Sequence, residues 1–136
     1  MNAHLNDSLQ NWAALIGRVL LSAVFIWSGF GKLIHFPGTL AYMQSYGVPM
    51  AEVLGAAALA IELGGGLMLA LGFRTRCAAA ALFLFMIPIT VIFHNPGQGQ
   101  GQLVHFMKNL SIMGGLLLPL AFGPGRFSLD SRLKKR

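Results

Sequence analysis

Six polar or ionisable side chains lie inside, or at the ends of, long apolar segments of this chain, where a polar group is costly unless it is paired or has a function. They are Arg18, Lys32, Glu62, His94, Lys108 and Asn109. Glu62 stands near the middle of its segment, where a charge costs about 2.5–3.5 kcal/mol if the segment crosses a membrane. We therefore expect its carboxylate to be paired, protonated or close to water. Such a group can bind a ligand or carry a proton.

Arg18 is the partner that we expect for Glu62. At a helical rise of ~1.5 Å per residue, the two residues would differ in membrane depth by roughly 6 Å, which a guanidinium side chain can span. The pair would either sit beside a ligand or serve only to set the register of two helices. The sequence favours neither interpretation over the other.

Lys32, His94 and Lys108, with Asn109 next to Lys108, fall near the opposite ends of their segments. Together they predict a shallow basic pocket for an anionic or carbonyl-bearing head group, with the apolar helices around its tail. The alternative is that lysine and histidine only anchor the helices at the membrane interface. We expect no metal site, because His94 and His105 give two ligands at best and no HxxxH or CxxC spacing occurs.

Composition determines the elements that must position these residues. The chain has 136 residues, of which 55% are hydrophobic and only 10% charged, whereas soluble domains carry about 25% charged residues. Four segments are long and apolar enough to cross a bilayer, at residues 12–33, 53–73, 77–93 and 103–122. The sequence thus predicts an all-α integral membrane four-helix bundle, with residues 1–136 forming one domain.

The basic residues predict how the bundle is oriented. With four spans, one side holds eight of the ten lysines and arginines: Arg18, Arg74, Arg76, Arg126, Arg132, Lys134, Lys135 and Arg136. Since positive charge is retained in the cytoplasm, we expect both termini there, with residues 123–136 as a basic tail that touches anionic lipid. The net charge of +6 thus indicates orientation in a bacterial inner membrane, and we expect no nucleic-acid partner.

Helical spacing predicts which face of each segment turns inward. The expected faces are Arg18, Ser22, Phe25, Gly29 and Lys32; Glu52, Gly55, Ala58, Glu62 and Gly66; Ala80, Phe83, Ile87, Thr90 and His94; and Lys108, Ser111 and Gly115. Residues 35–50 should form an ordered outer connection with a short interfacial helix that carries Tyr42 and Tyr46.

Several short motifs, in this order, resemble those of the DoxX family. They are GRVLL at 17–21 with SGFGKL at 28–33, ELGGG at 62–66, FMKNL at 106–110 and GPGRFSLD at 123–130. The resemblance implies a four-helix membrane protein, similar to uncharacterised enterobacterial inner-membrane members. Some relatives are linked to thiosulfate:quinone oxidoreductase and others to membrane redox complexes that handle oxidative or thiol stress. Arg18, Lys32, Glu62, Lys108 and Asn109 match its recurrent polar positions, for which the resemblance brings no catalytic assignment.

The resemblance and the polar seam together favour an accessory membrane subunit of a quinone-linked redox system. Its ligand would be a quinone or a similar lipophilic carrier, and a redox subunit or a second copy of the chain would be its partner. Independent catalysis is not expected, because the chain has a single cysteine, Cys77, and neither a haem-ligating histidine pair nor a nucleotide motif. The alternatives are a small transporter of lipophilic acids or aldehydes, with Glu62 as proton carrier, and a structural or assembly factor.

Overall fold

The computed structural model describes residues 2–134, which fold into helices joined by short connections. Four of the helices are long and apolar enough to cross a membrane: α1 (Asn2–Ile34), α3 (Ala51–Leu71), α4 (Thr75–Phe93) and α5 (Gln100–Phe122). Three short helices complete the described residues: α2 (Phe36–Ser45), the 3-10 helix η1 (Pro96–Gln98) and α6 (Leu129–Leu133). Residues 2–134 contain no strand, so the prediction of an all-α four-helix membrane protein is confirmed.

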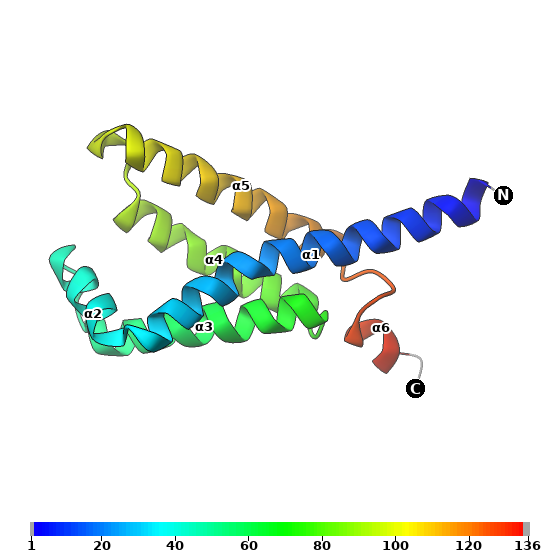
Figure 1. Cartoon of the computed structure of the whole chain (residues 1–136), viewed down its shortest axis with the longest axis horizontal. Helices are drawn as coiled ribbons and strands as arrows, with labels where there is room; N and C mark the ends of the chain where they lie inside the picture. The colour runs from blue at the N-terminus through cyan, green and yellow to red at the C-terminus, as the bar shows by residue number, and fades with distance from the viewer. Residues whose placement is uncertain (1, 135–136) are drawn as a thin grey trace.

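Successive long helices are antiparallel. The helix α6 and the beginning of α1 therefore lie at one end of the molecule, while α2 and η1 lie at the other (Figure 1). The α1 helix packs mainly on α3, α3 on α4, and α4 on α5. The beginning of α1 projects beyond the other helices (Figure 1). It therefore starts ten residues before the predicted boundary at residue 12, because the polar residues there contain no helix breaker.

Close packing of α1 on α3 follows the predicted small-residue faces. On α1, Arg18, Ser22, Phe25 and Gly29 are buried and Lys32 is partly buried; on α3, Gly55, Ala58, Glu62 and Gly66 are buried and only Glu52 is exposed. A Cβ atom added to Gly29 would lie 2.9 Å from the backbone nitrogen of Leu63. The two backbones can thus approach closely only because glycine stands at this position.

The predicted inward faces of the other two spans are largely wrong. On α4, Thr90 is buried as expected, but Ala78, Ala79, Leu82 and Met86 are buried in place of the face through Ala80, Phe83 and Ile87. On α5 the buried residues are Asn109 and Leu116, whereas Lys108 and Ser111 are exposed. The reason is that α4 is apolar around its whole circumference, so its sequence does not determine its rotation.

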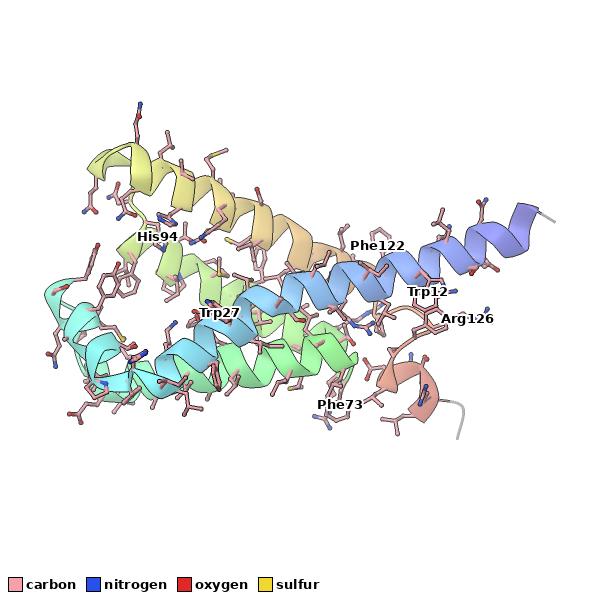
Figure 2. The ribbon with its side chains drawn as sticks, viewed as in Figure 1. Trp12, Trp27, Phe73, His94, Phe122 and Arg126 are labelled. Carbon is pink, nitrogen blue, oxygen red and sulfur yellow. The ribbon has the colours of Figure 1, made fainter. Side chains whose placement is uncertain are left out.

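Many large apolar side chains stay exposed on the outside of the bundle. Trp27 and Phe122 are 80% and 82% exposed, and Figure 2 shows their side chains on the helix surface. Exposure of this kind is unfavourable in water but suits contact with acyl chains. The lipid bilayer is therefore the partner of these surfaces.

The connection between α1 and α3 contains the expected short helix. Pro37 stands in the first turn of α2, where its missing N–H leaves no hydrogen bond unmade. Tyr42 lies within α2 and Tyr46 directly follows it. The Tyr42 ring stacks on Phe93 of α4 with ring centroids 5.4 Å apart, and the Tyr46 ring meets the same phenylalanine at 5.1 Å, so α2 is held against the end of α4.

Candidate functional site

Glu62 pairs with Lys32 and not with Arg18. The Lys32 ammonium nitrogen lies 2.7 Å from Glu62 Oε2. Ser28, one helical turn before Lys32, accepts a hydrogen bond from Lys32 Nζ at 2.9 Å and donates one to Glu62 Oε1 at 3.3 Å. The predicted Arg18–Glu62 pair is therefore wrong, and the buried carboxylate is held by two side chains of α1.

The position of Gly29 against Leu63 explains this pairing. Because α1 and α3 are antiparallel, that contact sets Ser28 and Lys32 opposite Glu62. Arg18 lies nearer the start of α1, about 21 Å from Lys32 along the helix at ~1.5 Å per residue. There its guanidinium reaches the carbonyl of Ala70. The prediction placed the start of the membrane span at residue 12 and thereby put Arg18 too deep.

The side chains of the Lys32–Glu62 pair are mostly buried. The side chain of Glu62 is 7% exposed and that of Lys32 is 22% exposed. Oε2 of Glu62 is buried and is held by the Lys32 ammonium group, and no other described donor lies within hydrogen-bond distance of it. An ionised carboxylate offers about four acceptor sites, so this one keeps acceptor capacity for a further donor.

The pair forms part of the wall of a pocket that lies between α1, α3 and α4 and is covered on one side by α2. We call this cavity of about 450 Å³ the Glu62 pocket. Its polar lining residues are Ser28, Lys32, His35, Thr39, Tyr42, Glu62 and His94, and its apolar ones include Met43, Ala58, Ile89 and Phe93. The hydrogen bond with Tyr46 and partial burial raise the pKa of Tyr42 to about 12, so its hydroxyl keeps its proton at neutral pH.

His94 joins this pocket to a second polar group outside it. Its Nδ1 lies 3.0 Å from Gln102 Oε1, and its ring stacks on His105 with centroids 5.1 Å apart. Lys108 Nζ lies 3.3 Å from Nδ1 of His105, but Lys108 is exposed and does not line the pocket. Of the predicted site residues, the structure thus brings together Lys32, Glu62 and His94.

Asn109 is buried elsewhere, between α4 and α5. Its side-chain amide donates to Thr90 Oγ1 at 3.1 Å, and the Thr90 hydroxyl donates to the carbonyl of Met86 at 2.7 Å. This chain of hydrogen bonds satisfies two buried polar side chains and links the two helices. Asn109 therefore acts in packing in this structure.

Arg18 holds the C-terminal segment at the opposite end of the molecule. Its guanidinium donates to the carbonyls of Ala70, Pro124 and Phe127, the first at 3.3 Å and the last at 2.8 Å. A buried arginine is thus neutralised in part by carbonyl dipoles, without a carboxylate partner among the described residues.

Asp130 fastens the same segment to the start of α4. Its carboxylate accepts hydrogen bonds from Arg74 N at 2.7 Å, Thr75 N at 2.9 Å and Thr75 Oγ1 at 2.8 Å. Partial burial raises the pKa of this carboxyl, but these hydrogen bonds and the nearby Lys134 outweigh burial and hold the pKa below its ordinary value. Lys135 and Arg136, which belong to the predicted basic tail, lie outside the described residues.

Sequence reasoning missed Ser28, His35 and Tyr42 as lining residues of the Glu62 pocket. Ser28 precedes Lys32 by four residues, a spacing that places both on one helix face and could have identified it. No comparable signal marks His35 or Tyr42, because they reach the pocket only through the path of the connection after α1.

Fold and site together define a class, the integral membrane four-helix proteins, here with a buried ion pair beside a pocket. Within that class the chain belongs to the DoxX family, whose sequence profile matches residues 13–95.

Individual relatives extend the similarity over nearly the whole chain. Inner membrane protein YqjF of Escherichia coli (strain K12) is 38% identical over 131 residues, which are 94% of this chain and 97% of that protein. Inner membrane protein YphA of the same organism is 37% identical over 123 residues, or 87% and 88% of the two chains. Uncharacterized membrane protein Rv3486 of Mycobacterium tuberculosis is 32% identical over 131 residues, or 88% and 80%.

No solved structure matches the chain significantly. The relatives nevertheless confirm the resemblance to the family and to its enterobacterial members. Together with the four candidate spans they make the chain a multi-pass inner-membrane protein.

Proposed function

We propose that the Glu62 pocket binds the head group of a small lipophilic carrier, namely a quinone, and that the protein is an accessory membrane subunit of a redox system. The observation that carries this proposal is the buried ion pair at the pocket wall, whose carboxylate is held by one ammonium group and one hydroxyl and keeps acceptor capacity for a ligand. A quinone offers carbonyl oxygens to Lys32 and His94, and its reduced form offers a hydroxyl to Glu62.

The size and lining of the pocket support such a ligand. A volume of about 450 Å³ falls within the usual range for small-molecule sites, which is roughly 300–1,000 Å³. The apolar side chains of Met43, Ile89 and Phe93 offer surfaces against which a ring can pack. The polar lining residues can fix the orientation of a head group that packs against these apolar surfaces.

The proposal is tested by titrating the purified protein in lipid nanodiscs with a short-chain benzoquinone and following the heat of binding. We expect saturable binding that Glu62→Gln and Lys32→Gln each weaken by roughly 10–100-fold, the usual effect of losing a charged hydrogen-bonding partner. Glu52→Gln is the matched control, since Glu52 is exposed on the same helix. Absence of saturable binding, or equal binding by Glu62→Gln and wild type, would refute the proposal.

Transport of a lipophilic acid or aldehyde is the alternative use of the same carboxylate. Liposomes with the wild-type protein would then show substrate flux coupled to proton movement, and Glu62→Gln would abolish the coupling. A quinone-binding subunit gives saturable quinone binding without such flux.

A further inference from the structure

A second cavity lies at the end of the molecule that carries both termini, between the C-terminal segment and the start of α4. We call it the basic pocket; its volume is about 810 Å³. Four basic side chains line it, those of Arg74, Arg76, Arg126 and Lys134, and Asp130 supplies the carboxylate of the lining. These cations come from the turn after α3, from α4 and from the C-terminal segment.

The one carboxylate in this lining does not neutralise the cations by direct pairing. Asp130 is occupied by the backbone nitrogens of Arg74 and Thr75 and by the Thr75 hydroxyl. No described carboxylate lies within ion-pair distance of the Arg74, Arg126 or Lys134 side chains. The basic pocket therefore carries an excess of positive charge that favours an anion.

An apolar groove begins where the basic pocket ends. It lies between α1 and α5 and has a volume of about 670 Å³, and its lining includes Ala13, Gly17 and Leu21 of α1 and Leu118 and Phe122 of α5. From residue 13 to residue 21 the helix rises about 12 Å. That length covers most of one leaflet of a hydrocarbon core about 30 Å thick.

Phe122 and Gly123 line both cavities, so the basic pocket and the apolar groove meet at the end of α5. Figure 2 shows Phe122, Arg126 and Trp12 towards the end of the molecule opposite to His94. Trp12, whose ring packs on Phe127 at 5.0 Å between centroids, has the amphipathic character of residues at a membrane interface. The joined site is thus charged at the interface and apolar within one leaflet.

We propose that this joined site binds an anionic phospholipid of the leaflet on the side of the two termini. The phosphate lies among Arg74, Arg126 and Lys134, and one acyl chain lies in the groove beside Gly17. Arg76 is already bound to the carbonyl of Ala121 at 3.2 Å and forms the rim. This site is separate from the Glu62 pocket and does not depend on the proposed quinone binding.

The head-group half is tested by native mass spectrometry of the full chain, released from nanodiscs that contain phosphatidylglycerol and phosphatidylcholine in equal amounts. We expect wild type to retain one phosphatidylglycerol in preference to phosphatidylcholine. The double variant Arg74→Gln/Arg126→Gln should lower the retained fraction at least tenfold, since each juxtamembrane cation contributes about a fivefold factor. Arg126→Gln alone should lower the retained fraction about fivefold, and Arg132→Gln is its control, because that substitution removes one charge from the same C-terminal segment at a residue that does not line the pocket.

The groove half is tested with Gly17→Leu, which fills the apolar groove. A Cβ atom at Gly17 meets no atom within 4 Å, so the variant should fold. Gly114→Leu is the matched control, since Gly114 has equally open space but does not line the groove. We expect Gly17→Leu to reduce the retained phosphatidylglycerol severalfold and Gly114→Leu to leave it unchanged.

Three outcomes would overturn the proposal. The first is equal retention of the two lipids by wild type, and the second is an equal loss of phosphatidylglycerol in Arg132→Gln and in the double variant. The third is that inorganic phosphate displaces phosphatidylglycerol equally well from wild type and from Gly17→Leu. The last result would indicate a site for free anions in place of a lipid. Circular dichroism of each variant confirms that the helices are intact.

Discussion

Buried charges at the residue scale are accommodated in two different ways in this protein. Glu62 is matched by an ammonium group and a hydroxyl from α1, whereas Arg18 is surrounded by carbonyl oxygens of α3 and the C-terminal segment. A carboxylate needs donors and an arginine offers up to five, so each group finds the partners that its chemistry requires. The first arrangement keeps a buried carboxylate at the wall of the Glu62 pocket, and the second holds the C-terminal segment against the helices.

A double-mutant cycle tests the pairing of Lys32 with Glu62. Lys32→Met leaves a buried carboxylate unpaired and should lower the free energy of unfolding in micelles by about 2–4 kcal/mol, less than for a fully buried pair because Lys32 is partly exposed. Glu62→Gln should cost less, since Lys32 can extend towards the interface. The double variant should lose about 1–3 kcal/mol less than the sum of the single variants.

Arg18→Gln combined with Glu62→Gln is the control for this cycle. The two residues share no partner, so their effects should add to within ~0.5 kcal/mol. Coupling between Arg18 and Glu62, or additivity between Lys32 and Glu62, would show that the pairing in the structure is wrong.

At the scale of elements, the contact between α1 and α3 determines where the functional side chains stand. Gly29 lies against the backbone of Leu63, and Gly66 lies against Phe25 and Ile26. In lipid no hydrophobic force drives the helices together, so close backbone approach and van der Waals packing supply the attraction. The register of the glycines therefore also places Ser28 and Lys32 opposite Glu62.

Gly29→Ala tests this dependence. The added methyl group would meet the Leu63 backbone at 2.9 Å and should destabilise the protein by about 1–3 kcal/mol in a denaturant titration in micelles. Gly31→Ala has open space around its Cβ position and should be neutral or stabilising by up to ~1 kcal/mol. If both variants unfolded alike, close packing at Gly29 would not hold α1 against α3.

At the scale of the whole molecule, the two ends of the bundle are chemically different. The end with α2 carries the Glu62 pocket, with aromatic and histidine side chains. The end with both termini carries the basic pocket, Arg18 and Asp130. Since basic residues are retained in the cytoplasm, we expect the Glu62 pocket to open towards the periplasmic half of the membrane.

Cys77, the single cysteine of the chain, provides a direct test of this orientation. It is exposed at the beginning of α4, on the side of the termini. A membrane-impermeant maleimide should leave Cys77 unlabelled in intact spheroplasts and label it in inverted vesicles. The variant Cys77→Ala/Gln98→Cys should give the reverse, because Gln98 is exposed at the other end. Labelling of Cys77 in spheroplasts would contradict the orientation.

How far the sequence predicts the candidate site depends on the helix. The inward faces of α1 and α3 were predictable, because polar and small residues recur there at helical spacing among large apolar ones. The presence of Glu62, Lys32 and His94 as candidates was predictable as well, since ionisable groups are rare in membrane segments. The rotation of α4 was not, because every face of that helix is apolar.

The sequence by itself determined that the chain is helical and crosses a membrane four times, because a bilayer admits few structures and their length and polarity are visible in composition. Only the tertiary structure decided that Glu62 meets Lys32, that Arg18 holds the C-terminal segment, and that α2 covers the Glu62 pocket. These pairings depend on the register between helices, and contacts of a few ångströms between backbones determine that register.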